Sequence, residues 1–288
     1  MCIRDRNIPE KYRNFEWGYE HNHFRQSRLS FRAGKKALEK IHLRPDGKWF
    51  SAVSQSSLLY VFDSETGAEI DLGKIERKGI FDSSWSPDGK LFGVRRVDRV
   101  DFHDATTLEF LKSISIHSRT GEELIFGADS KSIYTDFGYY LHRRSYVTGK
   151  KIWTAKIDHP TWEVRSIALS EDGSLLAAGR IRGRVDLYAT DNPSGEVGHQ
   201  FQGSLRNRWL EFNPDASILA IPQGTPTHKV DLINPRSGKK LRSIDTGNHY
   251  VVDVAFSPDG KRLLTGGLDT RVKPVSYTHL TLPTILLV

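Results

Sequence analysis

A short phrase recurs six times along the chain at nearly equal intervals, and this period limits the possible folds more than any other feature. Its clearest copy is FSPDGKRLL at residues 256–264. The six copies place aspartates 42, 41, 43, 43 and 44 residues apart, at Asp46, Asp88, Asp129, Asp172, Asp215 and Asp259. A regular period of this length indicates one supersecondary unit per repeat, packed against its neighbours along the chain.

The phrase has the chemistry of a tight turn between two strands. Proline fixes φ for the second position of a type I turn, and the glycine two residues later can adopt the left-handed conformation that closes a hairpin, as in Pro258 and Gly260. Apolar residues stand before the turn in every copy: Leu43, Trp85, Phe126, Leu169, Phe212 and Phe256. Apolar residues also follow every turn, so the pattern predicts two strands per repeat that bury side chains in a common core.

The rest of each repeat predicts two further strands. Segments 59–69 and 230–240 alternate apolar and polar residues and then end in a turn that contains Asp or Asn. Outer strands are expected in EFLKSISI, KIWTAKI and KKLRSID, at residues 109–116, 151–157 and 239–245. Four short strands in about 42 residues match one propeller blade. The sequence therefore predicts an all-β fold, a β-propeller of four-stranded antiparallel blades.

The repeat resembles the WD-repeat (WD40) family of β-propellers over residues 37–273. The resemblance implies a non-catalytic ring whose loops bind protein partners. The family's Trp-Asp pair is reduced here to Phe62-Asp63, and its Gly-His pair is missing, although His159 and His249 lie near its expected place. Blade cohesion is therefore expected to depend mainly on apolar burial. Six repeats are visible, and a seventh is expected in the intact protein because the family most often has seven blades.

The two ends of the chain do not fit the repeat. Residues 1–6, MCIRDR, and 275–288, which begin VSYTHLTLPT, can be encoded by one DNA sequence read in opposite directions, and they resemble translated transposon-end sequencing adapters. We expect residues 7–31 to form a linker or short helix, with a closing strand at 23–31, and residues 32–274 to form a propeller truncated at its C-terminus. The body lacks methionine, and RNFEW resembles a segment that precedes propellers in bacterial regulatory proteins, so we expect a fragment of such a protein.

The residue types exclude several kinds of chemistry. The single cysteine is Cys2, so the body has no thiolate nucleophile, disulfide framework or cysteine metal site. The histidines are scattered, and neither a Gly-x-Ser-x-Gly elbow nor a phosphate loop is present. We therefore expect no catalytic residue, cofactor or metal, with a propeller enzyme holding an axial cofactor as the alternative. No stretch is long and apolar enough for a membrane helix, and a cytoplasmic location is favoured.

Arginines beside aromatic residues gather in predicted loops on one side of the propeller, a composition typical of interface hot spots. The candidate partner-binding residues are Arg95, Arg96, Arg99, Trp162, Arg180, Arg182, Arg184, Arg206, Arg208 and Tyr250. The chain has a formal net charge of +7 at pH 7, and the planar fork of arginine suits carboxylate and phosphate. We predict an acidic protein or peptide partner. A phosphorylated partner or an anionic polymer is the alternative, and nucleic acid is disfavoured because no long Lys/Arg run is present.

Overall fold

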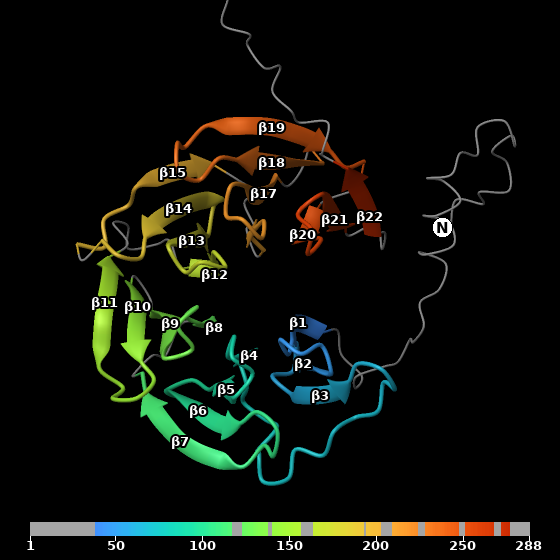
Figure 1. The fold of residues 1–288 in the computed structure, drawn as a ribbon, viewed down its shortest axis with the longest axis vertical. Coiled ribbons are helices and arrows are strands. Elements are labelled where there is room, and N and C mark those ends of the chain that lie inside the picture. Colours follow the sequence, from blue (N-terminus) through green and yellow to red (C-terminus); the bar gives the residue numbers. More distant parts are fainter. Residues whose placement is uncertain are drawn as a thin grey trace, which may run out of the picture.

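The protein was analysed as a computed structural model, which describes residues 38–116, 123–137, 140–156, 164–192, 194–202, 209–223, 228–247, 251–267 and 272–276. These ranges contain β-strands, turns and loops and no helix, and so no helix that could cross a membrane. The strands form six antiparallel sheets around a common centre (Figure 1). The predicted all-β propeller is confirmed, and each of the six repeats corresponds to one sheet.

In each blade the strands follow one another from the inside of the ring to the outside (Figure 1). Blade 1 contains β1 (Leu38–Leu43), β2 (Trp49–Ser54) and β3 (Leu59–Asp63). Blade 2 contains β4 (Asp82–Trp85), β5 (Leu91–Arg95), β6 (Arg99–Asp104) and β7 (Phe110–Ser115). Blade 3 contains β8 (Leu124–Phe126), β9 (Ser132–Phe137), β10 (Tyr140–Ser145) and β11 (Lys151–Lys156).

The same order continues through the second half of the chain. Blade 4 contains β12 (Val164–Leu169), β13 (Leu175–Arg180), β14 (Arg184–Ala189) and β15 (His199–Gln202). Blade 5 contains β16 (Glu211–Phe212), β17 (Leu219–Gln223), β18 (Lys229–Ile233) and β19 (Lys240–Asp245). Blade 6 contains β20 (Val251–Phe256), β21 (Arg262–Gly267) and β22 (Val272–Ser276). The outer strands predicted from EFLKSISI, KIWTAKI and KKLRSID are therefore confirmed as β7, β11 and β19.

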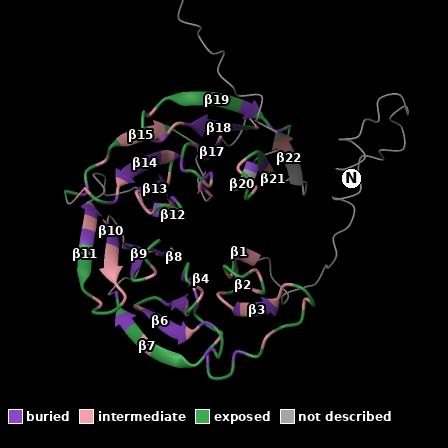
Figure 2. Ribbon diagram, viewed as in Figure 1, coloured by how far each residue is buried: buried purple, intermediate pink, exposed green. Residues whose placement is uncertain are grey.

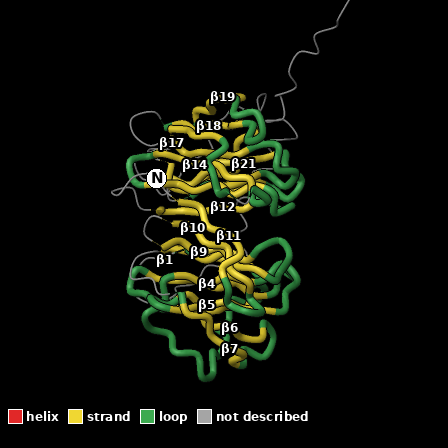
Figure 3. Tube along the Cα trace, turned by 90° about the vertical axis from the view of Figure 1, so that its left-hand side faces the viewer, coloured by secondary structure: helices red, strands yellow, loops and turns green. Residues whose placement is uncertain are grey.

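Blade 1 has an irregular outer edge in place of a fourth strand. The chain returns along β3, where the Ile70 backbone NH donates to the Val61 carbonyl at 2.8 Å and the Leu59 NH donates to the Arg77 carbonyl at 2.9 Å. Between these two contacts, residues 71–76 leave the edge of the sheet. In the edge-on view of Figure 3, loops and turns lie on both sides of the strand layer, so each blade offers two sets of connections.

The predicted turn chemistry is confirmed between the first and second strands. Gly260 has φ +64°, and glycines occupy the same position in blades 1, 2 and 4. In blades 3 and 5 the position is filled by Ser130 and Ala216, whose φ values are +52° and +55°. A serine before the proline position adds further bonds, since Ser257 Oγ donates to Asp259 at 2.5 Å and accepts from the backbone NH of Arg262 at 3.0 Å.

Apolar side chains form five buried clusters, and each cluster spans one pair of neighbouring blades. Between blades 1 and 2, for example, Val61 packs with Trp85 and Phe92, whose rings stack with centroids 4.1 Å apart. The second strands β2, β5, β13 and β17 are largely buried, whereas β7 and β19 expose most of their residues (Figure 2). The core is thus divided among the interfaces between blades.

Leu43 is the exception among the predicted core positions, because its side chain is 61% exposed. Ile41, two residues earlier on β1, is 60% exposed. Both lie on the opposite face of β1 from the cluster shared with blade 2, and among the described residues no apolar cluster joins blade 1 to blade 6. The prediction that Leu43 is buried was therefore wrong.

The domain boundaries stay predictions. β22 runs across the boundary placed at residue 275, since Val275 pairs with Leu263 and packs, half-buried, against the blade 6 cluster. The linker, short helix and closing strand predicted within residues 7–31 lie outside the described residues, as do residues 1–6 and 277–288.

Candidate functional site

The predicted arginines of blades 2 and 4 occupy equivalent places in the loop between the second and third strands. Arg95 and Arg180 are the last residues of β5 and β13, and Arg99 and Arg184 are the first residues of β6 and β14. Loops after the second strand lie on the opposite side of the ring from the Pro-Asp-Gly turns, because successive strands are antiparallel. We call the loops 96–98 and 181–183 the arginine loops.

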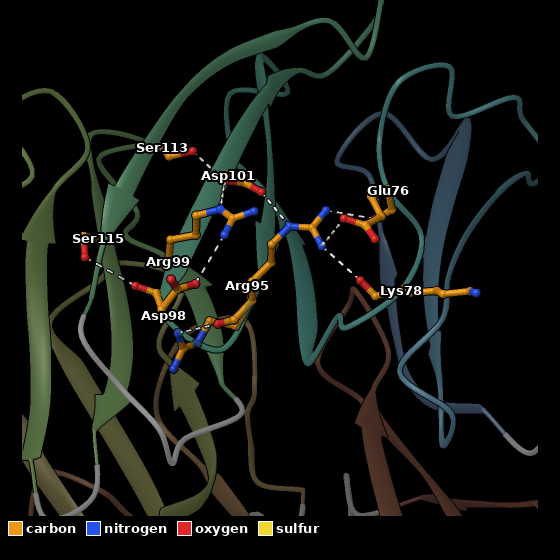
Figure 4. A network of polar contacts seen from close by, with 9 residues as sticks. Glu76, Lys78, Arg95, Asp98, Arg99, Asp101, Ser113 and Ser115 are labelled. Atoms are coloured by element: carbon orange, nitrogen blue, oxygen red, sulfur yellow. Dashed lines mark hydrogen bonds and ion pairs between the residues drawn. The ribbon is translucent and has the colours of Figure 1, made fainter.

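In blade 2 the arginine loop is built around the buried carboxylate of Asp101. Its oxygens accept hydrogen bonds from Arg96 Nε at 2.6 Å, Arg99 Nε at 2.9 Å and Ser113 Oγ at 2.5 Å (Figure 4). Burial opposes ionisation, but these hydrogen bonds and the charge of Arg99 hold the pKa of Asp101 below its ordinary value. Asp101 is therefore ionised at neutral pH and fixes the direction of both arginines.

Arg96 also joins this loop to the irregular edge of blade 1. Its two terminal nitrogens donate to the backbone carbonyls of Lys78 and Glu76, each at 2.9 Å (Figure 4). Arg95 is fully buried and donates to the carbonyl of Arg96 at 2.8 Å. Through these contacts, Arg95 and Arg96 stabilise the arginine loop of blade 2 and its contact with blade 1.

In blade 4 the equivalent acid is Asp186, which is fully buried beside the fully buried Arg180. Arg180 forms an ion pair with one oxygen of Asp186, and Arg184 Nε donates to the other at 2.9 Å. Tyr188 contributes its hydroxyl, which lies 3.3 Å from Asp186 and 3.4 Å from Arg180. Arg180 is thus part of the interior of blade 4.

The structure divides the predicted partner-binding residues into three groups. Arg95, Arg96 and Arg180 are buried, so the expectation that they lie on the binding surface is corrected. Exposure remains at Arg182, and partly at Arg99 and Arg184, whose side chains are 42% and 23% exposed. The other predicted residues lie outside the described residues: Trp162, Arg206, Arg208 and Tyr250.

The two arginine loops differ in their exposed charge. In blade 2, Asp98 is 63% exposed and lies 3.4 Å from Arg99, so positive and negative charges alternate there. In blade 4, Arg182 has φ +68°, and Gln202 from β15 donates to its carbonyl at 2.8 Å. Among the described residues, no carboxylate forms an ion pair with Arg182. Its guanidinium is therefore exposed on this side of the ring without an ion-pair partner among the described residues.

A second group of charges lies on the inner strands, where Asp82 connects three blades. Its carboxylate, 1% exposed, lies 3.0 Å from His42 Nε2 and 3.3 Å from Lys40 Nζ of blade 1, and it accepts from the Leu124 backbone NH of blade 3 at 2.9 Å. Lys40 also pairs with Glu123 at 3.0 Å. Burial opposes the charge of Lys40, but Asp82 and Glu123 raise its pKa overall. The group is an internal salt-bridge cluster that no sequence pattern had singled out.

In blade 5, Glu211 of β16 is an acid that has no cationic partner among the described residues. Burial, together with the nearby Asp253 carboxylate, raises the pKa of Glu211 to about 8, although a hydrogen bond from the Phe256 backbone NH at 3.3 Å opposes the shift. Among the described residues, no cation forms an ion pair with Glu211. The carboxyl is therefore largely protonated at neutral pH.

This raised pKa predicts a stability that decreases with pH. Glu211 binds its proton more tightly in the folded protein than in the unfolded chain, so its contribution is fully present below its ordinary pKa of 4.5 and is lost as pH rises through about 8. Between about pH 5 and pH 9 we expect wild type to lose about 4 kcal/mol more unfolding free energy than Glu211→Gln. Urea unfolding at several pH values measures the difference, and parallel curves would contradict the prediction.

No metal centre is formed within the described ranges, where no three His, Cys, Asp or Glu side chains come together in a way that could hold an ion. On the inner strands, Lys40, His42 and Asp82 belong to the salt-bridge cluster, whereas Glu211 and Asp253 are acids whose pKa is raised mainly by burial.

Two segments of the chain match protein-family models. Residues 133–207 match the model of the anaphase-promoting complex subunit 4 WD40 domain, and residues 238–273 match the WD domain, G-beta repeat. These two segments are WD40 repeats. The resemblance seen in the Pro-Asp-Gly phrase is thereby confirmed, and WD40 propellers are generally non-catalytic and commonly bind protein partners.

Individual relatives show the same repeat. The chain is 26% identical to the human U3 small nucleolar RNA-associated protein 18 homolog, over 63% of this chain and 34% of that protein. It is 23% identical to protein HIR1 of Kluyveromyces lactis, over 87% of this chain and 35% of that protein. It is 31% identical to an uncharacterized WD repeat-containing protein of Synechocystis sp., over 36% of this chain and 26% of that protein. The chain thus spans about a third or less of the length of each.

Proposed function

We propose that this WD40 propeller is a non-catalytic scaffold that binds a protein partner through the side of the ring bearing the arginine loops. The observation that carries the proposal is the construction of these loops. In both blades, buried arginines and a buried aspartate fix the loop, while Arg99, Arg182 and Arg184 remain at its surface. Loops fixed on a rigid ring are the usual place for recognition, because the scaffold limits the entropy lost on binding.

An acidic polypeptide fits this surface best. Arginine forms bidentate contacts with carboxylates, and Arg182 is exposed without an ion-pair partner among the described residues. Asp98 interrupts the positive charge at the blade 2 loop. Separate positive positions suit a peptide with discrete carboxylates better than a uniformly charged polymer. We propose further that the chain is the interaction module of a larger bacterial regulatory protein, as the resemblance of RNFEW implies.

Reversing the exposed charges should weaken binding of an acidic peptide. We expect Arg99→Glu combined with Arg182→Glu to reduce affinity for a fluorescein-labelled Glu-rich peptide by about tenfold at low salt, because each exposed charge contributes up to about 1 kcal/mol. Fluorescence anisotropy measures the affinity. The matched control is Lys90→Glu with Lys261→Glu, which changes net charge equally in turns on the opposite side of the ring. Equal affinity of the two double variants would contradict the proposed binding side.

A further inference from the structure

A cavity of about 410 Å³ opens at the Pro-Asp-Gly side of the ring, opposite the arginine loops. It is lined by the ends of the innermost strands of blades 3 to 6, which are β8, β12, β16 and β20, and by the turns that follow three of them. β16 contacts both β12 and β20, so the lining belongs to one continuous wall. The cavity is therefore made by four repeats together.

The walls of this cavity are mostly apolar. They include Ile125, Leu169, Phe212, Phe256 and Pro258. These side chains come from the positions at and before each turn, where the repeat places apolar residues. Phe212 is 7% exposed, so much of this surface is already shielded from water. An apolar body of a few carbons would be removed from water on entering, which contributes about 25 cal/mol for each Å² buried.

The ionisable residues of the lining are all acidic. They are Glu171, in the turn after β12, and Glu211 on β16, and no Lys, Arg or His lines the cavity. Asp253 of β20 does not line the cavity, but its carboxylate is close enough to Glu211 to raise the pKa of Glu211. The chain as a whole carries +7, so this acidic mouth contrasts with the rest of the molecule.

Glu211 is placed to meet a ligand. Its Oε2 accepts from the Phe256 backbone NH at 3.3 Å, and this contact fixes the carboxyl at the cavity wall. Among the described residues no cation pairs with Glu211, so the half-buried carboxyl holds its proton at neutral pH. A bound cation would pair with the ionised carboxylate and favour loss of this proton.

From this geometry we propose that the cavity binds the basic side chain of a partner polypeptide, with the aliphatic stem against Leu169, Phe212 and Phe256 and the cationic end at Glu211. Lysine and arginine have this composition, an apolar stem that ends in a cation. The site is separate from the arginine loops and lies on the opposite side of the ring. It does not depend on the acidic partner proposed for those loops.

Binding of a small cation measures this site directly. The probe is n-butylguanidinium, and its uncharged counterpart of the same shape is n-butylurea. We expect n-butylguanidinium to shift the NMR signals of the Leu210, Phe212 and Phe256 amides in the full chain, and to bind more than about tenfold more tightly than n-butylurea at pH 9. Because the Glu211 carboxyl must lose its proton to pair with the cation, affinity should also rise by more than about tenfold from pH 6 to pH 9.

Variants at Glu211 separate charge recognition from simple apolar binding. Glu211→Gln removes the charge while its amide oxygen can still accept from Phe256, and we expect it to bind both probes equally and weakly. Glu211→Asp keeps the charge and should retain the preference for the cation. Glu109→Gln, at an exposed position of blade 2, is the matched control and should behave as wild type. Equal binding of the two probes to wild type, or an unchanged preference in Glu211→Gln, would overturn the proposal.

Discussion

Replacing Asp186 by alanine is expected to lower the free energy of unfolding by about 3–5 kcal/mol, the range typical of leaving one charge of a buried pair alone. Asp186 and Arg180 are both fully buried, and Arg184 donates to the same carboxylate. Without Asp186, the guanidinium of Arg180 keeps its charge inside blade 4 and loses its ion-pair partner there. Urea unfolding followed by tryptophan fluorescence measures the change.

Two comparisons identify the cause of this loss. Asp191→Ala removes an exposed carboxylate two residues beyond β14, and it should change stability by less than about 0.5 kcal/mol. Arg180→Met combined with Asp186→Leu replaces the pair by apolar side chains and should recover most of the stability. If Asp186→Ala were no more destabilising than Asp191→Ala, the ion pair would not support blade 4.

The second large effect is expected at Asp82. Replacing Asp82 by alanine should lower the free energy of unfolding by about 3–5 kcal/mol. The carboxylate of Asp82 contacts Lys40 and His42 of blade 1 and the Leu124 backbone NH of blade 3, so its removal affects three blades. It also leaves that buried NH without this acceptor, which adds a desolvation cost. Thermal unfolding of the variant measures the total loss.

Hydrogen exchange tests whether the Asp82 effect is spread over neighbouring blades. We expect faster exchange in β1 and β8 of Asp82→Ala, and unchanged exchange in β18 of blade 5, which pairs with β17 and β19 of its own blade. Faster exchange confined to β4 would show that Asp82 acts only within its own blade. Asp191→Ala again serves as the exposed control, because it removes the same group from the surface.

The sequence predicted the architecture well because propeller blades depend on local and periodic signals. The turn at Asp259-Gly260 has a fixed chemistry, and the apolar positions beside it recur every 41 to 44 residues. Leu43 shows where periodicity is insufficient, since the same position is buried only if another blade covers that face of the sheet. Burial of a repeated position thus depends on its neighbours as well as on its place in the repeat.

The candidate site was predicted only in part, because arginine serves both surfaces and interiors. Arg95 and Arg180 were expected at the surface, yet both are fully buried. Asp101 and Asp186, each placed on the third strand two residues after an arginine, were the signal that could have shown an internal pair. Glu211 had no such signal, because its raised pKa arises from side chains contributed by other repeats.

The division of the apolar core into five clusters, each shared by two adjacent blades, has a consequence for how the protein responds to force or heat. Such an array behaves like a one-dimensional chain of coupled units, in which a disturbance decays with the number of interfaces it crosses. Blades 2 to 5 each have an apolar cluster on both sides, whereas blades 1 and 6 take part in one each within the described residues. Unfolding should therefore begin at blades 1 and 6 and proceed blade by blade toward blades 3 and 4.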